Sequence, residues 1–271
     1  MPDTTTGIAE INGTKIYYEF AGEGRGLVLI HDEITDSRMW DDQFQVFAEH
    51  YRVVRLDLRG YGRSEMVAGD FAHHEDVRDL LKVLTIDRAY FLGCALGGRV
   101  AIDYTLVYPE MVAGVITVGG TVSGYRNQTG PIPQEKDLSE ALARNDLEQA
   151  NELQLQMWVD GPQRTPDQVG SAVREQVRAM NAKNLQTQFG VGNEQIVEPR
   201  AITRLYELQT PVLAIVGQLD QPVAHAVADA MVAGIAGAKK SVIYHAAHLP
   251  NMERPAEFNQ VVLTYLAHLN D

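Results

Sequence analysis

The chain has 271 residues, 45% of them hydrophobic, which is enough for one large α/β domain with an inserted subdomain and a sizeable core. Its formal net charge of -13 argues against binding to nucleic acid or to an anionic membrane, because both need clustered Lys and Arg. Its single cysteine, Cys94, excludes an intramolecular disulfide, and neither a signal peptide nor a transmembrane segment is indicated, so we expect a cytoplasmic protein.

In residues 1–123, short β-branched runs alternate with amphipathic stretches, a pattern typical of a mostly parallel sheet covered by helices. Asn12 and Gly13 separate the first two strands and favour a tight hairpin, so the sheet should begin antiparallel. The expected strands are 7–11, 14–20, 26–30, 51–57, 89–93 and 112–119, and the expected helices are 37–48, 74–85 and 96–108. These elements predict the N-terminal part of an α/β core.

The alternation stops in residues 124–200, which are rich in Gln, Asn, Glu and Arg at helical spacing. We therefore predict a helical insertion that forms a cap. Residues 201–271 return to the sheet, with strands at 211–217 and 240–245 and a last helix at 254–269. Within the cap, Trp158 is a candidate wall of a substrate pocket, although such residues more commonly face the core of their own helices.

The first candidate for chemistry is the turn after the strand at 89–93. Ligands of open α/β sheets bind beyond the carboxyl ends of the strands. In "FLGCALGG", Gly93 and Gly97 have the spacing of a G-x-S-x-G nucleophile elbow, but its apex is Ala95, which has no oxygen for an acyl-enzyme route. We interpret the adjacent Cys94 as a packing residue, since neighbouring side chains at such a turn point in different directions.

Nearly the whole chain resembles the α/β-hydrolase family, in particular its capped esterases and lactonases. "LVLIH" followed by "DSRMWDDQ" resembles the family's oxyanion strand and first helix, and "LDLRGYGRS" resembles its D-x-R-G-x-G-x-S segment. The resemblance implies that Asp220 in "VGQLDQPV" is the catalytic acid and that His248 in "HAAHLPNMERPAEFN" is the catalytic histidine. The nucleophile position is then Ala95, and the order nucleophile, acid, histidine also matches.

The residues themselves agree with these roles. His248 follows a strand, so its imidazole can reach the elbow, and Asp220 stands at another strand end, where a carboxylate could orient the ring. A loop-capping carboxylate is the alternative for Asp220. His245 ends a buried strand and suits the part of a core histidine, whereas His73 and His74 precede a helix and are interpreted as solvated or capping residues.

The segment "HDEITD" departs from the family, which usually has a small residue after the histidine. The resemblance implies that the backbone N–H groups of Glu33 and Leu96 would hold an oxyanion. A carboxylate there would oppose the negative charge unless Glu33 is protonated or turned to solvent, and Asp32 with Glu33 could equally be a solvated acidic pair before a helix. His31 and Asp32 are further pocket candidates, but adjacent residues rarely converge on a metal.

The function predicted from these observations is hydrolysis of small carboxylic esters or lactones by a Ser-His-Asp type triad, here in an inactive nucleophile-to-Ala form. A small-molecule ester or lactone is the expected partner, and no metal or organic cofactor is implied. Two alternatives stay open. One is a non-covalent acid/base catalyst, such as a lyase or a redesigned enzyme, that uses His248 with Asp220 or Glu33. The other is a ligand-binding pseudoenzyme.

Overall fold

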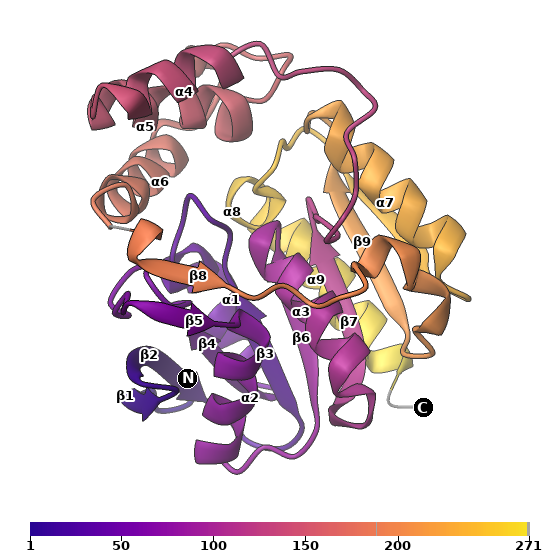
Figure 1. Ribbon diagram of the computed structural model, residues 1–271. Coiled ribbons are helices and arrows are strands. Elements are labelled where there is room, and N and C mark those ends of the chain that lie inside the picture. Colours follow the sequence, from indigo (N-terminus) through magenta and orange to yellow (C-terminus); the bar gives the residue numbers. More distant parts are fainter. Residues whose placement is uncertain (188, 270–271) are drawn as a thin grey trace.

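The computed structural model describes residues 1–187 and 189–269, and a twisted eight-stranded sheet forms its centre (Figure 1). The strands are β1 (Thr5–Ile11), β2 (Thr14–Ala21), β3 (Gly26–Ile30), β4 (Arg52–Leu56), β6 (Ala89–Cys94), β7 (Val112–Val118), β9 (Val212–Gly217) and β10 (Lys239–Ile243). Their spatial order is β1-β2-β4-β3-β6-β7-β9-β10. β2 is antiparallel to both β1 and β4, and the remaining pairs are parallel, so the predicted mostly parallel sheet is confirmed.

The hairpin between β1 and β2 forms at the predicted dipeptide. Asn12 and Gly13 have φ values of 47° and 71°, and Ile11 pairs with Thr14 across the turn. Positive φ at both central residues is the requirement of a two-residue hairpin turn whose twist matches its strands. This short turn is what makes the sheet begin antiparallel.

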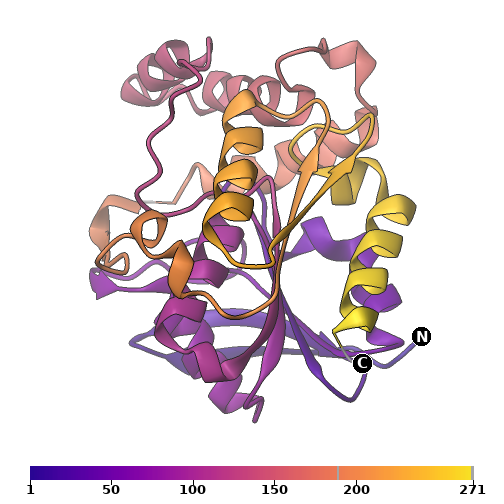
Figure 2. The same ribbon diagram turned by 90° about the vertical axis from the view of Figure 1, so that its right-hand side faces the viewer.

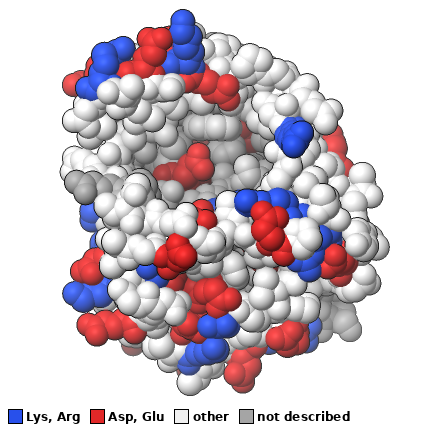
Figure 3. Space-filling model, viewed as in Figure 1, with Lys and Arg blue, Asp and Glu red and all other residues white. Residues whose placement is uncertain are grey.

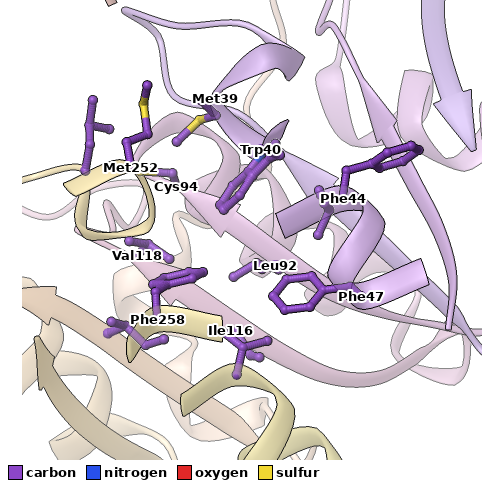
Figure 4. Close-up of a cluster of buried hydrophobic side chains, with 14 of the residues drawn as sticks. Met39, Trp40, Phe44, Phe47, Leu92, Cys94, Ile116, Val118, Met252 and Phe258 are labelled. Atoms are coloured by element: carbon purple, nitrogen blue, oxygen red, sulfur yellow. The ribbon is translucent and has the colours of Figure 1, made fainter. Parts of the chain in front are cut away.

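Helices cover both faces of the sheet (Figure 2). α1 (Asp41–Ala48) and α9 (Pro255–His268) pack on one face, and α2 (His73–Val83), α3 (Leu96–Val107) and α7 (Pro222–Gly234) pack on the other. Every residue of β3, β6 and β9 is buried, as expected for parallel strands with helices on both sides. Figure 4 shows the hydrophobic core between the sheet and the helices α1 and α9, where Cys94 packs near Trp40, Val118 and Met252.

The structure differs from the predicted elements in a few places. The helix expected at 37–48 begins with a 3₁₀ turn, η1 (Ser37–Trp40), and the Asp36 side chain caps its start by accepting a hydrogen bond from the Arg38 N–H. The last helix is preceded by a short one, α8 (Pro250–Glu253). α7 was not predicted, because its Ala-rich sequence has no clear polar face. Two three-residue strands, β5 (Gly69–Phe71) and β8 (Gly192–Glu194), pair in parallel outside the main sheet and are too short to show a periodicity.

Residues 124–200 contain α4 (Glu135–Ala143), α5 (Leu147–Gln154), a π-helical turn η3 (Leu155–Asp160) and α6 (Ser171–Asn184). α4, α5 and α6 lie together beyond the ends of the sheet strands, at the top of Figure 1. The Arg174 guanidinium joins α6 to η3 through Asp160, with Nε–Oδ1 and Nη2–Oδ2 distances of 2.8 and 3.1 Å. Within the described residues, no helix has both the length and the apolar composition needed to cross a membrane.

Candidate active site

The turn from β6 into α3 has the backbone of an elbow with Ala95 at its apex. Ala95 has φ 41° and ψ −104°, a region that non-glycine residues rarely adopt. Its N–H donates to the Val118 carbonyl at 2.9 Å, and its own carbonyl accepts from the Thr121 hydroxyl at 2.9 Å. The surrounding structure therefore holds a strained residue in place, as is common at functional sites.

The glycines of this turn are needed because backbones approach closely. A Cβ atom added to Gly93 would overlap the carbonyl oxygen of Gly97, and one added to Gly97 would overlap the carbonyl oxygen of Ile30 at the end of β3. No side chain is tolerated at either position without moving the backbone. The G-x-x-x-G spacing thus encodes how β3, β6 and α3 meet at Ala95.

Asp220 and His248 form a buried pair beside Ala95. His248 Nδ1 lies 2.9 Å from Oδ2 and 3.0 Å from Oδ1 of Asp220, and the Gln221 N–H donates to Asp220 Oδ1 at 2.7 Å. Burial alone would lower the pKa of His248, but the charge and hydrogen bond of Asp220, together with the nearby Asp32 and Glu33, raise this pKa to about 9. The imidazole is therefore held as a cation at neutral pH.

Trp158 covers the His248 ring from the π-helical turn η3. The two ring centroids are 4.6 Å apart, and the backbone N–H of His248 donates to the Trp158 backbone carbonyl at 3.3 Å. The Gln221 amide nitrogen donates to the neighbouring Met157 carbonyl at 2.6 Å, so the loop that bears Asp220 is also tied to η3. π-helical turns are rare and are frequent at functional sites.

The loop after β3 is fixed by backbone hydrogen bonds. The Asp32 carbonyl accepts from the Thr35 N–H and hydroxyl, both at 3.1 Å, and lies 2.7 Å from His31 Nδ1. His31 Nε2 accepts from the Leu58 N–H at 2.9 Å, which leaves the imidazole proton on Nδ1. His31 was predicted as a pocket residue, but it lies beneath the loop with both ring nitrogens bonded, and it does not line the cavity.

The Asp32 carboxyl group turns back toward its own loop. Oδ1 accepts from the Glu33 N–H at 2.5 Å, and Oδ2 has no hydrogen-bond partner among the described residues. Burial raises the pKa of Asp32 to about 7, with the charges of Glu33 and Asp220 adding to the rise and His248 opposing it. This carboxyl group therefore carries a proton for much of the time at neutral pH.

Replacing Asp32 with asparagine is expected to stabilise the fold at neutral and alkaline pH. The folded-state pKa lies above the usual Asp value of 3.8, so stability is lost as the pH rises from 3.8 to about 7. Asparagine keeps the acceptor for the Glu33 N–H but has no charge. We expect a free energy of unfolding higher than the parent's by on the order of 2–4 kcal/mol above pH 7, and no gain below about pH 4. Urea unfolding across this range measures the difference, and a pH-independent gain would contradict the charge argument.

Glu33 also borders the cavity. Glu33 is an exposed residue that lines the cavity, and its partial loss of water raises the carboxyl pKa against the opposing charges of His248 and Arg99. Figure 3 shows acidic atoms inside the hollow beneath the helices of residues 124–200. Glu33 is thus in contact with the cavity and is not a remote surface residue.

One cavity, open to solvent and with a volume of about 60 Å³, brings most of the predicted site residues together. It is lined by Asp32, Glu33, Ala95, Gly119, Gly120, Thr121, Trp158, Val223, Ala224, Val227 and His248. Asp220 lies behind the His248 ring. Leu96 is buried at the first position of α3, next to Ala95, and does not line the cavity.

Sequence reasoning missed two groups of cavity residues. Gly119, Gly120 and Thr121 follow β7, and their position after a strand was an available signal. Gly119 has φ 52°, and a Cβ atom there would lie 2.7 Å from the His248 ring, so this glycine makes room for the imidazole. Val223, Ala224 and Val227 belong to α7, which had not been predicted.

Two histidines are placed differently from expectation. His73, predicted to be solvated or capping, is buried in the first turn of α2 against Phe71, and burial holds its pKa well below the usual range. His245, predicted to suit a core position, is exposed and has φ 58°, because β10 ends at Ile243. Among residues 1–187 and 189–269, no group of three or more His, Cys, Asp or Glu side chains is arranged to hold a metal ion.

The sequence matches one protein family and is similar to curated hydrolases and esterases. The model of the alpha/beta hydrolase fold family matches residues 27–255. The chain is 26% identical over 266 residues to a 2-hydroxy-6-oxononadienedioate/2-hydroxy-6-oxononatrienedioate hydrolase of Paraburkholderia xenovorans (strain LB400), covering 94% of this chain and 91% of the relative. It is 27% identical over 258 residues to a pimeloyl-[acyl-carrier protein] methyl ester esterase of Serratia marcescens, covering 94% and 99%.

A solved structure is also similar to this chain over nearly its whole length. Est816, described as an N-acyl homoserine lactone degrading enzyme, superimposes with a TM-score of 0.77 at 26% identity, covering 96% of this chain and 100% of that chain. The similarity in all three cases spans nearly the full length, so it includes both the sheet and residues 124–200.

Proposed function

The chain belongs to the alpha/beta hydrolase fold family, and from this premise we propose that its cavity is an ester- or lactone-hydrolase site of the Ser-His-Asp type that lacks the nucleophilic oxygen. The observation that carries the proposal is the elbow. Ala95 is held at φ 41° and lines the same cavity as His248, which is bonded to Asp220. The similarity to an esterase and to a lactone-degrading enzyme supports this substrate class.

With serine at position 95, each remaining group has a role in acyl transfer. The hydroxyl oxygen would attack the carbonyl carbon while His248 Nε2 takes its proton and later returns it to the leaving group. Asp220 fixes the imidazole through Nδ1. Leu96 is the first residue of α3, and its N–H, which has no partner within the helix, is a donor for the oxyanion. Alanine supplies no attacking atom, so we expect this chain to be inactive as a hydrolase until serine is restored.

We also propose that residues 124–200 act as a cap over this cavity. Three contacts support the idea besides the Trp158 ring above His248. Arg164 Nη1 pairs with Glu253 Oε2 at 2.6 Å, the Asn184 amide nitrogen donates to the Thr35 carbonyl at 2.7 Å, and Gln221 donates to Met157. A cap fixed at these points would exclude water from the cavity while leaving an entrance for a small substrate.

A second candidate function is non-covalent proton transfer next to a carbonyl group. The observation that favours it is the position of Asp32 and Glu33 in the same cavity as His248, a change from the family pattern that is separate from Ala95. Neutral His248 would remove a proton from the carbon beside the carbonyl. The C–H electrons would form a C=C bond, and the carbonyl oxygen would take a proton from a carboxylic acid, giving an enol. Return of a proton from His248 to the same carbon, with the enol O–H proton going back to the carboxylate, regenerates the carbonyl compound with an exchanged hydrogen.

This second function predicts hydrogen exchange catalysed by the unchanged Ala95 chain. In D₂O, the protons beside the carbonyl of cyclohexanone should exchange roughly 10²- to 10⁴-fold faster than with the His248→Gln variant, the usual contribution of general acid–base groups. The rate should rise with pH up to about 7, stay level to about 9 and then fall, because the base must be neutral His248 while the acid, Asp32, must still carry its proton. NMR follows the exchange, and equal rates for parent and variant would rule out this function for His248.

A further inference from the structure

We propose that the Asp32 carboxyl group, as a neutral acid, donates a hydrogen bond from Oδ2 to the carbonyl oxygen of the substrate, in place of the Glu33 backbone N–H. The inference rests on the proposed function in one respect, namely that the substrate is a carbonyl compound bound in the cavity that contains Ala95 and His248. It assigns to Asp32 a direct contact with substrate that applies to both acyl transfer and enolisation.

The backbone donor expected at the oxyanion position is already engaged. The Glu33 N–H, which the family resemblance assigns to the oxyanion, donates to Asp32 Oδ1 at 2.5 Å. Oδ1 can accept this bond while Oδ2 carries the proton, so the N–H stays engaged when Asp32 is neutral. A substrate oxygen would therefore have to displace the Asp32 side chain in order to reach the Glu33 N–H.

Asp32 is held firmly by its neighbours, while one of its carboxyl oxygens is left without a hydrogen-bond partner among the described residues. The residue is only 1% exposed, and its carbonyl is bonded by Thr35 and His31. Oδ1 is occupied by Glu33, so Oδ2 is the atom left for a ligand, and it has no partner among the described residues. Leaving a buried polar atom unbonded costs about 1–3 kcal/mol. A ligand acceptor in the cavity that Asp32 lines would remove this cost.

The charges that face Asp32 favour the neutral form of its carboxyl group. The titratable groups around it are His248 and Asp220 at the strand ends, Glu33 in its own loop, Tyr61, and the Cys94 thiol. Two of these groups, Glu33 and Asp220, disfavour a further negative charge on Asp32. Burial outweighs the opposing His248 cation and raises the pKa of Asp32 to about 7. A carboxylic acid kept neutral in this way is an effective donor to a developing oxyanion.

The arrangement also defines the class of ligand. No Lys or Arg is among the described residues that line the cavity, whereas Asp32 and Glu33 both contribute carboxyl groups. The cation in the cavity, His248, is already paired with Asp220, so a carboxylate ligand would meet Glu33 without a free counter-charge. An uncharged ester, lactone or ketone would offer the acceptor that Oδ2–H needs. We therefore infer that the cavity selects neutral carbonyl compounds over carboxylates.

The test uses the intact Ala95 protein and γ-butyrolactone labelled with ¹³C at the carbonyl, with infrared difference spectroscopy as the readout. A hydrogen bond to the carbonyl lowers its stretching frequency, so the bound band should lie below the free band when Asp32 is neutral. The frequency shift should shrink as the pH rises through about 7. The Asp32→Asn variant, which keeps an N–H donor, should show the shift at all pH values, and Asp32→Ala should lose it.

The matched control is Asp103→Asn, which neutralises a buried carboxyl group on α3 that is bonded to the Ser123 hydroxyl outside the cavity. It should behave like the parent. A shifted band that survives Asp32→Ala, a shift that does not depend on pH in the parent, or the absence of a bound band would each overturn the inference. Because this readout needs no turnover, failure of the serine variant to hydrolyse esters would count against the proposed hydrolase and not against the Asp32 contact.

Discussion

Ala95→Ser is expected to hydrolyse p-nitrophenyl acetate on the order of a millionfold faster in turnover than the parent chain, because loss of the nucleophile in such triads has about that effect. Ala95 already has the strained backbone of the elbow, its side chain lines the cavity, and a hydroxyl adds one atom to an existing Cβ. Release of p-nitrophenolate measures the rate. Activity should rise with pH up to about 7, since the triad needs neutral His248 as its base, and the rise should flatten above that pH as Asp32 loses its proton.

Two comparisons make this result interpretable. The double variant Ala95→Ser with His248→Gln should lose the gained activity, which separates triad chemistry from a hydroxyl that reacts by itself. Thermal unfolding of each variant shows whether the fold is kept, and a folded Ala95→Ser chain without any gain would end the hydrolase proposal. The proton-transfer function, which does not need an oxygen at position 95, would then be the better account of the cavity.

Most of the fold could be predicted from the sequence, because its signals are local. β3 was predicted with its observed bounds, since a five-residue apolar run between turn signals has few alternatives. The elbow was predictable because glycine spacing records a backbone approach, here Gly97 against β3. α7 was missed because alanine and valine lie all around its surface, although Pro222 at its first turn and high helix propensity were available signals.

The candidate site was less accessible to sequence reasoning. The order of the chain suggested positions 95, 220 and 248, but no periodicity tells which way a side chain turns. Whether the Asp32 carboxyl faces solvent or bonds the next N–H depends on the packing of its loop under Thr35 and Met39. Likewise, the burial of His73 depends on β5, a three-residue strand without a pattern of its own. Such features follow from tertiary contacts and need the structure.

Asp220→Asn in the Ala95→Ser background is expected to lower turnover by roughly 10⁴-fold, the effect of the same change in other triads. Asp220 accepts the Nδ1 proton of His248 through two oxygens at 2.9 and 3.0 Å. An asparagine amide group facing Nδ1 would donate to it instead, so the ring proton would move to Nε2, where the serine needs an acceptor. The negative charge of Asp220, which stabilises the protonated imidazole, would be lost as well. Steady-state kinetics with p-nitrophenyl acetate measures the change.

The control is again Asp103→Asn in the same Ala95→Ser background. Asp103 pairs with Arg99 at 3.5 Å on the same helix, and an asparagine oxygen can still face Arg99 and accept from the Ser123 hydroxyl. It should leave turnover within a few fold of the Ala95→Ser chain. If Asp220→Asn lowered turnover no more than Asp103→Asn does, Asp220 would be a loop-capping carboxylate that happens to touch His248. A loss of turnover seen only with Asp220→Asn, with KM unchanged, would mean that Asp220 orients the base and does not bind substrate. This is expected because Asp220 lies behind the imidazole and does not line the cavity.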